Sequence, residues 1–249
     1  MLILLPPSET KRPGGRPRPF DAGALSHPSL APQREAVIDA LVTLSRDEER
    51  AARILKLGVS QRGEIAVNAG LRSAPTMPAV DRYTGVLFDA LDAASLGVSA
   101  RRWLAGHVRV HSAPFGPVGA LDPIPAYRLG ASASLPGVPP LRRLWADAVT
   151  AALAAEPSRF TLDLRSEAYV ALGPVPASVP SAYVRVVAEG ESGAVRALNH
   201  FNKHAKGALV RRLAESRPRI GSRRAFLSWA DAAGLRVRDG AAGEIELFA

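Results

Sequence analysis

Apolar positions along this chain of 249 residues recur with two different spacings. The apolar run 2–5 is ended by Pro6 and Pro7, which predicts a short buried first strand. Further strands are predicted by alternation at period two, or by short runs of β-branched and aromatic residues, at 107–111, 160–164, 181–188 and 244–248.

Between these strands lie segments in which apolar residues recur with helical spacing. It predicts helices over 34–57, 81–95, 99–104, 141–155, 201–216 and 224–233. Within the first range, Ser45 and Glu48 form a capping-box pattern that predicts a second helix ending before Gly58. Strands interleaved with helices indicate one mixed α/β domain over residues 1–249, a mixed sheet flanked by helices.

Composition narrows the class of protein. Hydrophobic residues make up 47% and charged residues 22% of the chain, as in ordinary globular domains. Cysteine is absent, which excludes disulfides, thiolate zinc sites, cysteine-ligated clusters and a cysteine nucleophile. The opening apolar run is far shorter than the roughly 18 residues of a membrane span. We therefore expect a cytoplasmic protein with no membrane partner.

The formal net charge of +9 favours polyanionic partners such as nucleic acid, nucleotides or phosphates. A second interpretation is compositional background. The chain is rich in alanine, arginine, proline and glycine, and most of its 32 basic residues are arginines.

Several short motifs follow one another in an order that resembles the YaaA peroxide-stress family. They span residues 2 to about 211: the segments 2–11, 83–85, 112–116, 121–123, 125–130 and 144–145, the positions Leu164, Ser166 and Tyr169, and the segment 203–207. The resemblance implies a cytoplasmic protein linked to resistance against hydrogen peroxide and to limiting free intracellular iron. It also implies a family-specific α/β fold with a positively charged cleft and a helix-hairpin-helix-like element that binds duplex or branched DNA.

The hairpin segment departs from the pattern of that family. Its candidate residues here are Ser112, Phe115, Gly116 and Asp122, but Pro114 and Pro117 each remove a backbone N–H donor, and Gly119 replaces a usual basic residue. Because such hairpins hold phosphate through backbone amides, we expect a weaker contact with DNA here.

A basic region runs from Arg196 to Arg224, with Glu215 as its only acid. Lys203 and Lys206 lie near one face of the predicted helix, and Gly207 allows close approach of a phosphate or of another part of the backbone. These residues and Arg211 are candidate phosphate contacts. The alternative is a solvated helix face.

Other candidates follow predicted strands, where open α/β sheets bind ligands. Ser8 and Lys11 come after the first strand, and Arg165 and Ser166 after the strand at 160–164. Arg165 could instead form a structural ion pair with Asp163 or Glu167. Tyr83, Thr84, Tyr127 and Arg128 are candidates for the same cleft, although a helical tyrosine commonly packs in the core.

No cofactor is expected. His107 and His111 would stand about 13 Å apart on one strand, too far to share a metal ion. His200 and His204 have helical spacing but lack a third ligand nearby. The sequence contains no recognisable catalytic motif, so we expect a DNA-binding protein that reads backbone and shape. The alternative is an enzyme acting on a nucleotide-like or phosphorylated small molecule, with Ser8, Lys11, Asp163, Arg165, Tyr169 and Lys203 in one pocket.

Overall fold

The computed structural model describes residues 1–17, 20–187 and 195–248. Its main sheet has the strand order β4-β3-β1-β6-β7-β9-β8, in which β3, β1, β6, β7 and β9 are parallel and the two edge strands run antiparallel. These strands are β1 (Leu2–Leu5), β3 (Val108–Ser112), β4 (Gly116–Gly119), β6 (Thr161–Asp163), β7 (Ser181–Val187), β8 (Val237–Asp239) and β9 (Glu244–Phe248). Strands β2 (Met77–Pro78) and β5 (Pro123–Ile124) form a separate antiparallel pair.

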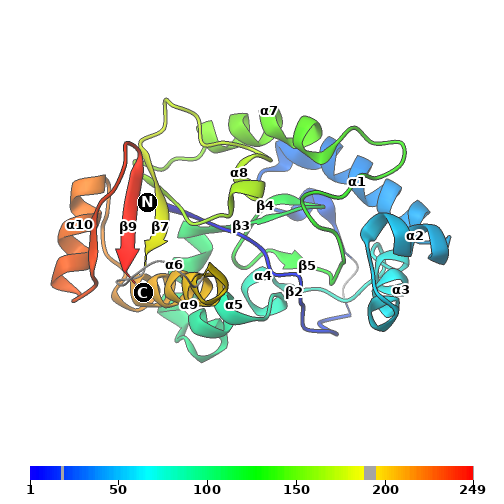
Figure 1. Ribbon diagram of the computed structural model, residues 1–249, viewed down its shortest axis with the longest axis horizontal. Helices are drawn as coiled ribbons and strands as arrows, with labels where there is room; N and C mark the ends of the chain where they lie inside the picture. The colour runs from blue at the N-terminus through cyan, green and yellow to red at the C-terminus, as the bar shows by residue number, and fades with distance from the viewer. Residues whose placement is uncertain (18–19, 188–194, 249) are drawn as a thin grey trace.

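Helices connect the strands and cover the sheet. They are α1 (Ala31–Leu44), α2 (Glu48–Leu55), α3 (Gly63–Ala69), α4 (Ala79–Arg82), α5 (Val86–Leu91), α6 (Val98–His107), α7 (Leu141–Ala154), α8 (Glu167–Val170), α9 (Val195–Ser216) and α10 (Arg223–Ala232). In Figure 1, α7 lies above the sheet, while α5, α6 and α9 lie below it. The first strand is wholly buried between these layers, as expected for a short apolar run in a parallel sheet.

The order of the strands creates a switch point beside β1. The chain passes from β1 to its neighbour β3, and later adds β6, β7 and β9 on the other side of β1. Because parallel crossovers are right-handed, connections that proceed in opposite directions lie on opposite faces of the sheet. The loops after β1 and β6 therefore diverge, and open α/β sheets bind ligands in the crevice between such loops.

The structure confirms the mixed α/β fold and the predicted strands at 2–5, 160–164 and 244–248 to within a residue or two. The strand at 181–188 is confirmed as far as Val187, because residue 188 lies outside the described part. The helices predicted at 141–155 and 224–233 are also present, as α7 and α10. Helix α9 begins at Val195, six positions before the predicted start at 201.

Three predictions about local structure were wrong. The range 81–95 is not one helix, because Tyr83 is extended and Gly85 has a φ of 92°, which separates α4 from α5. Helix α2 is capped by Asp47, whose carboxylate accepts from the Arg50 amide, while Ser45 bonds back to the Leu41 carbonyl. His107 ends α6 rather than beginning a strand, so it does not share a strand face with His111.

The segment assigned to a helix-hairpin-helix forms a β-hairpin instead. Strands β3 and β4 pair with Ser112 opposite Gly116, and the side chains of Ser112 and Phe115 are fully buried. The Asp122 carboxylate accepts from the amides of Gly119 and Ser26 at 2.8 and 2.7 Å. A Cβ at Gly119 would stand 2.7 Å from the Ser26 hydroxyl oxygen, so the turn leaves no room for the usual basic residue. These residues hold the sheet edge together.

Candidate functional site

Lys11 lies at the carboxyl edge of the sheet, in the loop that leaves β1. Its backbone pairs with Tyr83, and its ammonium group donates to the carbonyls of Ser8 and Glu9 at 3.0 and 3.1 Å. The Nζ atom lies 4.0 Å from the centre of the Tyr127 ring and 5.5 Å from that of Tyr83. Carbonyl oxygens and aromatic faces stabilise a cation without neutralising its charge.

Burial changes the chemistry of this amine. It lowers the pKa of Lys11 from 10.5 to about 7, and the more distant charges of Glu64 and Glu9 oppose that shift. Within the described residues, no carboxylate oxygen lies within 4.0 Å of Lys11 Nζ. Lys11 can therefore gain or lose a proton close to neutral pH, and its charge is not taken up by an ion pair.

Two tyrosines form the wall beside Lys11. The hydroxyl groups of Tyr83 and Tyr127 lie 2.7 Å apart, and both rings are buried. Burial raises the pKa of each phenol, while the nearby Ser112 hydroxyl at the end of β3 lowers both values. Both tyrosines are therefore neutral hydrogen-bonding groups at any ordinary pH.

The loop after β6 adds a second group of polar residues. The carboxylate of Asp163 forms two hydrogen bonds with the guanidinium of Arg165, from Nε at 2.9 Å and from Nη2 at 2.6 Å. Arg165 also donates to His111 Nδ1 and to the Gly173 carbonyl, both at 2.9 Å. Because Nδ1 is the acceptor, the proton of neutral His111 is on Nε2, which has no partner within the described residues. Arg165 therefore forms a structural ion pair with Asp163, which was the alternative to ligand binding. Its side chain is too buried to contact a ligand.

Lys206 approaches this region from α9. Burial lowers the pKa of Lys206 to about 8, while the charge of Asp163 raises it and that of Arg185 lowers it. Its Nζ atom lies 5.6 Å from the centre of the Tyr183 ring, on β7. Lys206 therefore extends the polar edge from β1 and β6 toward β7.

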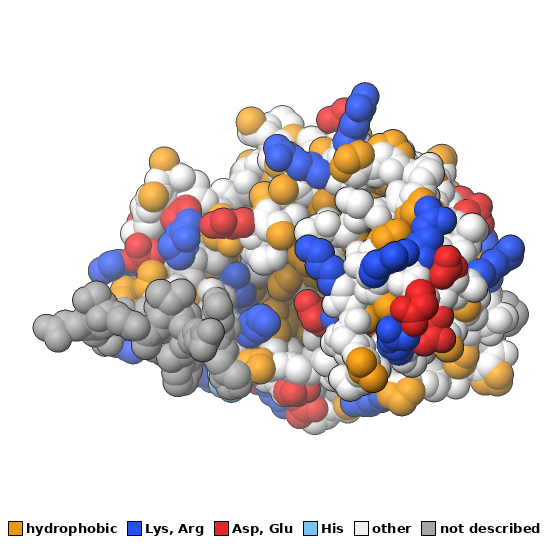
Figure 2. Space-filling view, turned by 45° about the vertical axis from the view of Figure 1, so that its right-hand side comes forward, with side chains coloured by type: hydrophobic (Ala, Val, Ile, Leu, Met, Phe, Trp, Pro, Cys, Tyr) orange, Lys and Arg blue, Asp and Glu red, His pale blue; other side chains and the backbone are white. Residues whose placement is uncertain are grey.

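We use the term Lys11 site for Lys11, Tyr83, Ser112, Tyr127 and Tyr169. Tyr169 belongs to it because burial raises the pKa of its phenol, and the nearby Tyr127 and Glu9 raise it further. Figure 2 shows a hollow near the middle of one face of the molecule, with basic, acidic and apolar side chains around it.

The structure brings several of the predicted residues to this edge. Ser8 is half-buried, and Thr84 donates through its hydroxyl to the Thr10 hydroxyl, which lies 3.2 Å from that of Ser8. Arg128 reaches the same loop but forms an ion pair with Glu9 at 3.0 Å. Ser166 is exposed at the start of α8.

Other predicted residues lie apart from the Lys11 site or have structural contacts. Arg211 holds the end of α5 through the Leu91 and Asp92 carbonyls and pairs with Glu215 at 3.0 Å. Gly207 is the point where α9 packs against α5, because a Cβ there would overlap the Leu87 carbonyl oxygen. Lys203 is exposed on α9. The side chains of Arg196 and His200 lie outside the described residues.

The sequence pattern pointed only weakly to Tyr127, Asp163 and Tyr169, and it suggested His111 only as a metal ligand. All of these residues except Tyr127 lie at the end of a parallel strand or a few residues beyond it. Their position relative to the predicted strands could therefore have identified them from the sequence. Tyr127 follows the small pair β2–β5 and reaches Lys11 only through the tertiary fold. Within the described residues, no three potential metal-ligating side chains cluster.

Comparison with known proteins supports the resemblance found in the sequence. The family model described as "Peroxide stress protein YaaA" matches residues 1–239. A UPF0246 protein of Corynebacterium glutamicum is 42% identical over 243 residues, which are 96% of this chain and 95% of that protein. A UPF0246 protein of Corynebacterium efficiens is 46% identical over 87% of this chain and 86% of its own length. One of Streptomyces coelicolor is 42% identical over 86% and 82%.

No helix in the described part of the chain is long and apolar enough to cross a membrane. The match to the family model covers nearly the whole sheet, from β1 to β8, and so includes the loops that carry the Lys11 site. The chain belongs to the family of the peroxide stress protein YaaA.

Proposed function

We propose that this protein binds a phosphorylated, nucleotide-like small molecule at the Lys11 site. The observation that carries the proposal is the amine of the half-buried Lys11, which lies at the switch point of the sheet beside two tyrosine rings and has no carboxylate partner within the described residues. When charged, this amine suits a phosphate oxygen, and the half-buried Ser8 in the same loop adds a hydroxyl group.

Catalysis on that molecule is the form of the proposal that the chemistry favours. A lysine whose pKa is about 7 holds and releases protons at neutral pH, which is the property required of a general acid or base. The neutral Tyr83–Tyr127 pair offers a hydroxyl donor beside it. The family's description connects the chain with peroxide stress, and we propose that the bound molecule acts in that response.

The test measures binding by calorimetry with adenosine 5′-monophosphate, adenosine and inorganic phosphate. Lys11→Met keeps the apolar stem but removes the charge, and we expect it to weaken the binding of adenosine 5′-monophosphate about tenfold or more. Lys56→Met is the matched control, because Lys56 is exposed at the end of α2. Equal affinity in Lys11→Met and Lys56→Met would refute the proposal.

Binding of duplex or branched DNA is the second candidate, favoured by the net charge of +9 and the exposed Lys203. Most of the other cations expected to contact phosphates are buried or paired, which is why we place DNA second. If Lys203 binds one phosphate of the duplex, Lys203→Ala should lower the salt slope of duplex binding by about 0.9. An unchanged slope would count against a DNA contact at α9.

A further inference from the structure

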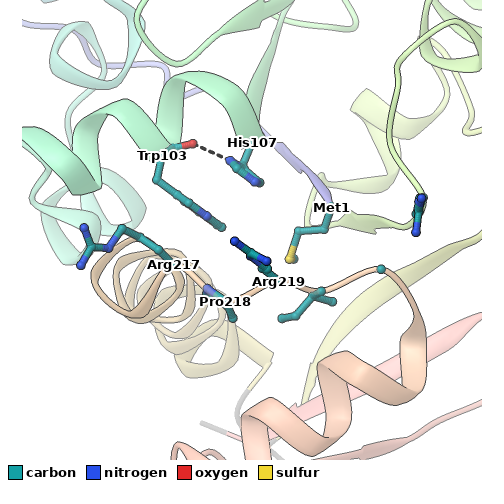
Figure 3. Close-up of a pocket in the computed structure, with 9 residues that line it drawn as sticks. Met1, Trp103, His107, Arg217, Pro218 and Arg219 are labelled. Atoms are coloured by element: carbon teal, nitrogen blue, oxygen red, sulfur yellow. Dashed lines mark hydrogen bonds between the residues drawn. The ribbon is translucent and has the colours of Figure 1, made fainter.

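A cavity of about 480 Å³ lies at the opposite edge of the sheet from the Lys11 site. Met1 and Arg159 line it just before β1 and β6 begin, and the loop from Arg217 to Gly221 closes it between α9 and α10. In Figure 3, Arg219 lies beside the Trp103 ring with Met1 on its other side. The length of β1 therefore separates this cavity from Lys11.

Three arginines line the cavity, and none has an ion-pair partner in the described part of the chain. Within that part, no carboxylate oxygen lies within 4.0 Å of a guanidinium nitrogen of Arg159, Arg217 or Arg219. Nearby arginines differ, since Arg109 pairs with Glu156 at 2.8 Å and Arg223 with Asp239 at 2.6 Å. The cavity is therefore lined by positive charge that these residues do not neutralise, and arginine's planar fork suits phosphate oxygens. In Figure 3 the guanidinium of Arg217 is directed away from Trp103 and Met1, whereas that of Arg219 lies between them.

An aromatic wall faces these cations. The rings of Trp103 and His107 stack with centroids 4.1 Å apart and planes at 7°. His107 Nδ1 lies 2.8 Å from the Trp103 carbonyl, which can only accept, so Nδ1 carries the proton. Burial lowers the pKa of His107, so the ring is neutral at pH 7 and its Nε2 is an acceptor. The wall therefore offers apolar contact and one hydrogen-bond acceptor beside the arginines.

We propose that this cavity binds a phosphate monoester with a planar or apolar body, such as a nucleoside monophosphate. Arg159 and Arg219 hold the phosphate, while Trp103 and Met1 contact the body of the ligand. The volume lies within the range of about 300–1,000 Å³ typical of small-molecule sites. The site is independent of the Lys11 site, because it uses other residues at the other edge of the sheet.

The experiment uses the full chain carrying Lys11→Met, so that binding at the Lys11 site is suppressed. Adenosine 5′-monophosphate, adenosine and inorganic phosphate are titrated by calorimetry and by tryptophan fluorescence. We expect the monophosphate to bind more tightly than either of its parts and to change the emission of Trp103. Trp103→Phe is expected to abolish the change in emission. Neither Trp145, which is buried in the core, nor Trp229, on α10, is among the residues that line the cavity.

Variants of the arginines complete the test. Arg159→Met and Arg219→Met are each expected to weaken monophosphate binding about tenfold. Arg217→Gly is one control that should leave binding unchanged, because the Arg217 guanidinium is directed away from Trp103 and Met1 (Figure 3) and glycine suits the left-handed backbone there, at a φ of 50°. Arg142→Met on α7 is the exposed control. The proposal fails if Arg159→Met and Arg219→Met bind the monophosphate as tightly as Arg142→Met does. It also fails if Lys11→Met alone abolishes all monophosphate binding, and that result would support the Lys11 site.

Discussion

The ammonium nitrogen of Lys11 lies 4.0 Å from the centre of the Tyr127 ring, whose hydroxyl is 2.7 Å from that of Tyr83. Two effects act on the same amine. Burial disfavours its charged form, whereas the ring face and the Ser8 and Glu9 carbonyls favour it. The result is an amine whose charge changes near neutral pH.

The stability of the protein should depend on pH through Lys11. The folded-state pKa of about 7 lies below the ordinary value of 10.5, so between these values the unfolded chain binds a proton that the folded chain does not. The contribution of Lys11 is therefore fully present above pH 10.5 and lost as the pH falls through 7. From pH 7 to 10, wild type should gain about 2–4 kcal/mol in free energy of unfolding relative to Lys11→Met.

Urea denaturation of both proteins at several pH values checks this difference. Lys206, whose pKa is also lowered, is present in both proteins, so its contribution cancels. A difference between the two proteins that stays flat over this range would mean that Lys11 keeps an ordinary pKa.

The tyrosine pair should behave as a coupled unit. Tyr83→Phe or Tyr127→Phe leaves one buried hydroxyl without its partner, at a cost of about 1–2 kcal/mol in unfolding free energy. The double variant removes both hydroxyls and should cost less than the sum of the single variants. Chemical denaturation of the three variants measures the coupling, and strictly additive costs would show that the hydrogen bond contributes nothing.

The fold was predictable from the sequence where the pattern is local. The run 2–5 and the amphipathic stretch 141–155 indicate their elements without reference to the rest of the chain. The break at Tyr83–Gly85 was missed because Thr84 and Lys11 hold that turn through contacts with residues distant in sequence. Strand β4 was missed because the resemblance suggested a helix-hairpin-helix-like element there, and because its glycine and proline positions give no strand pattern.

The candidate site was predictable only in part. Lys11 and Ser8 were found because they follow the first strand, a rule that depends on the sheet alone. Arg128 and Arg211 were chosen for their charge, but the sequence does not show that Glu9 and Glu215 pair with them. The pair of Arg165 with Asp163 was one of the alternatives that the sequence left open. Partners far apart in the chain, such as Glu9 and Arg128, meet only in the folded state.

Loss of the Asp163 carboxylate should damage the fold severely. Arg165 is fully buried, so Asp163→Asn leaves its guanidinium charge without its only carboxylate partner within the described residues. We expect a loss of about 3–5 kcal/mol in unfolding free energy. Glu244→Gln is the matched control, because the pair of Glu244 with Arg185 has the same bidentate geometry, at 2.9 and 2.6 Å, but is exposed. This variant should lose at most about 1 kcal/mol in unfolding free energy. Similar losses in both variants would contradict the buried charge at Arg165.

Gly207 and Gly106 should respond to alanine in opposite directions. A Cβ at Gly207 would overlap the Leu87 carbonyl oxygen and stand 2.9 Å from the Ala90 Cβ, so Gly207→Ala should cost about 1–3 kcal/mol by forcing α9 from α5. A Cβ at Gly106, within α6, meets nothing within 4 Å, so Gly106→Ala should stabilise the helix by up to about 1 kcal/mol. Thermal denaturation compares the two, and a neutral Gly207→Ala would refute the close packing of α9 on α5.

The pKa of Lys11 itself, measured by NMR on the isotope-labelled amine, tests the central claim most directly. Lys11→Met identifies the signal by its absence. Without ligand, the amine should titrate near pH 7. With saturating adenosine 5′-monophosphate, the phosphate charge should favour the ammonium form and raise the pKa by about one unit or more. A pKa near 10.5 that the ligand leaves unchanged would contradict the account.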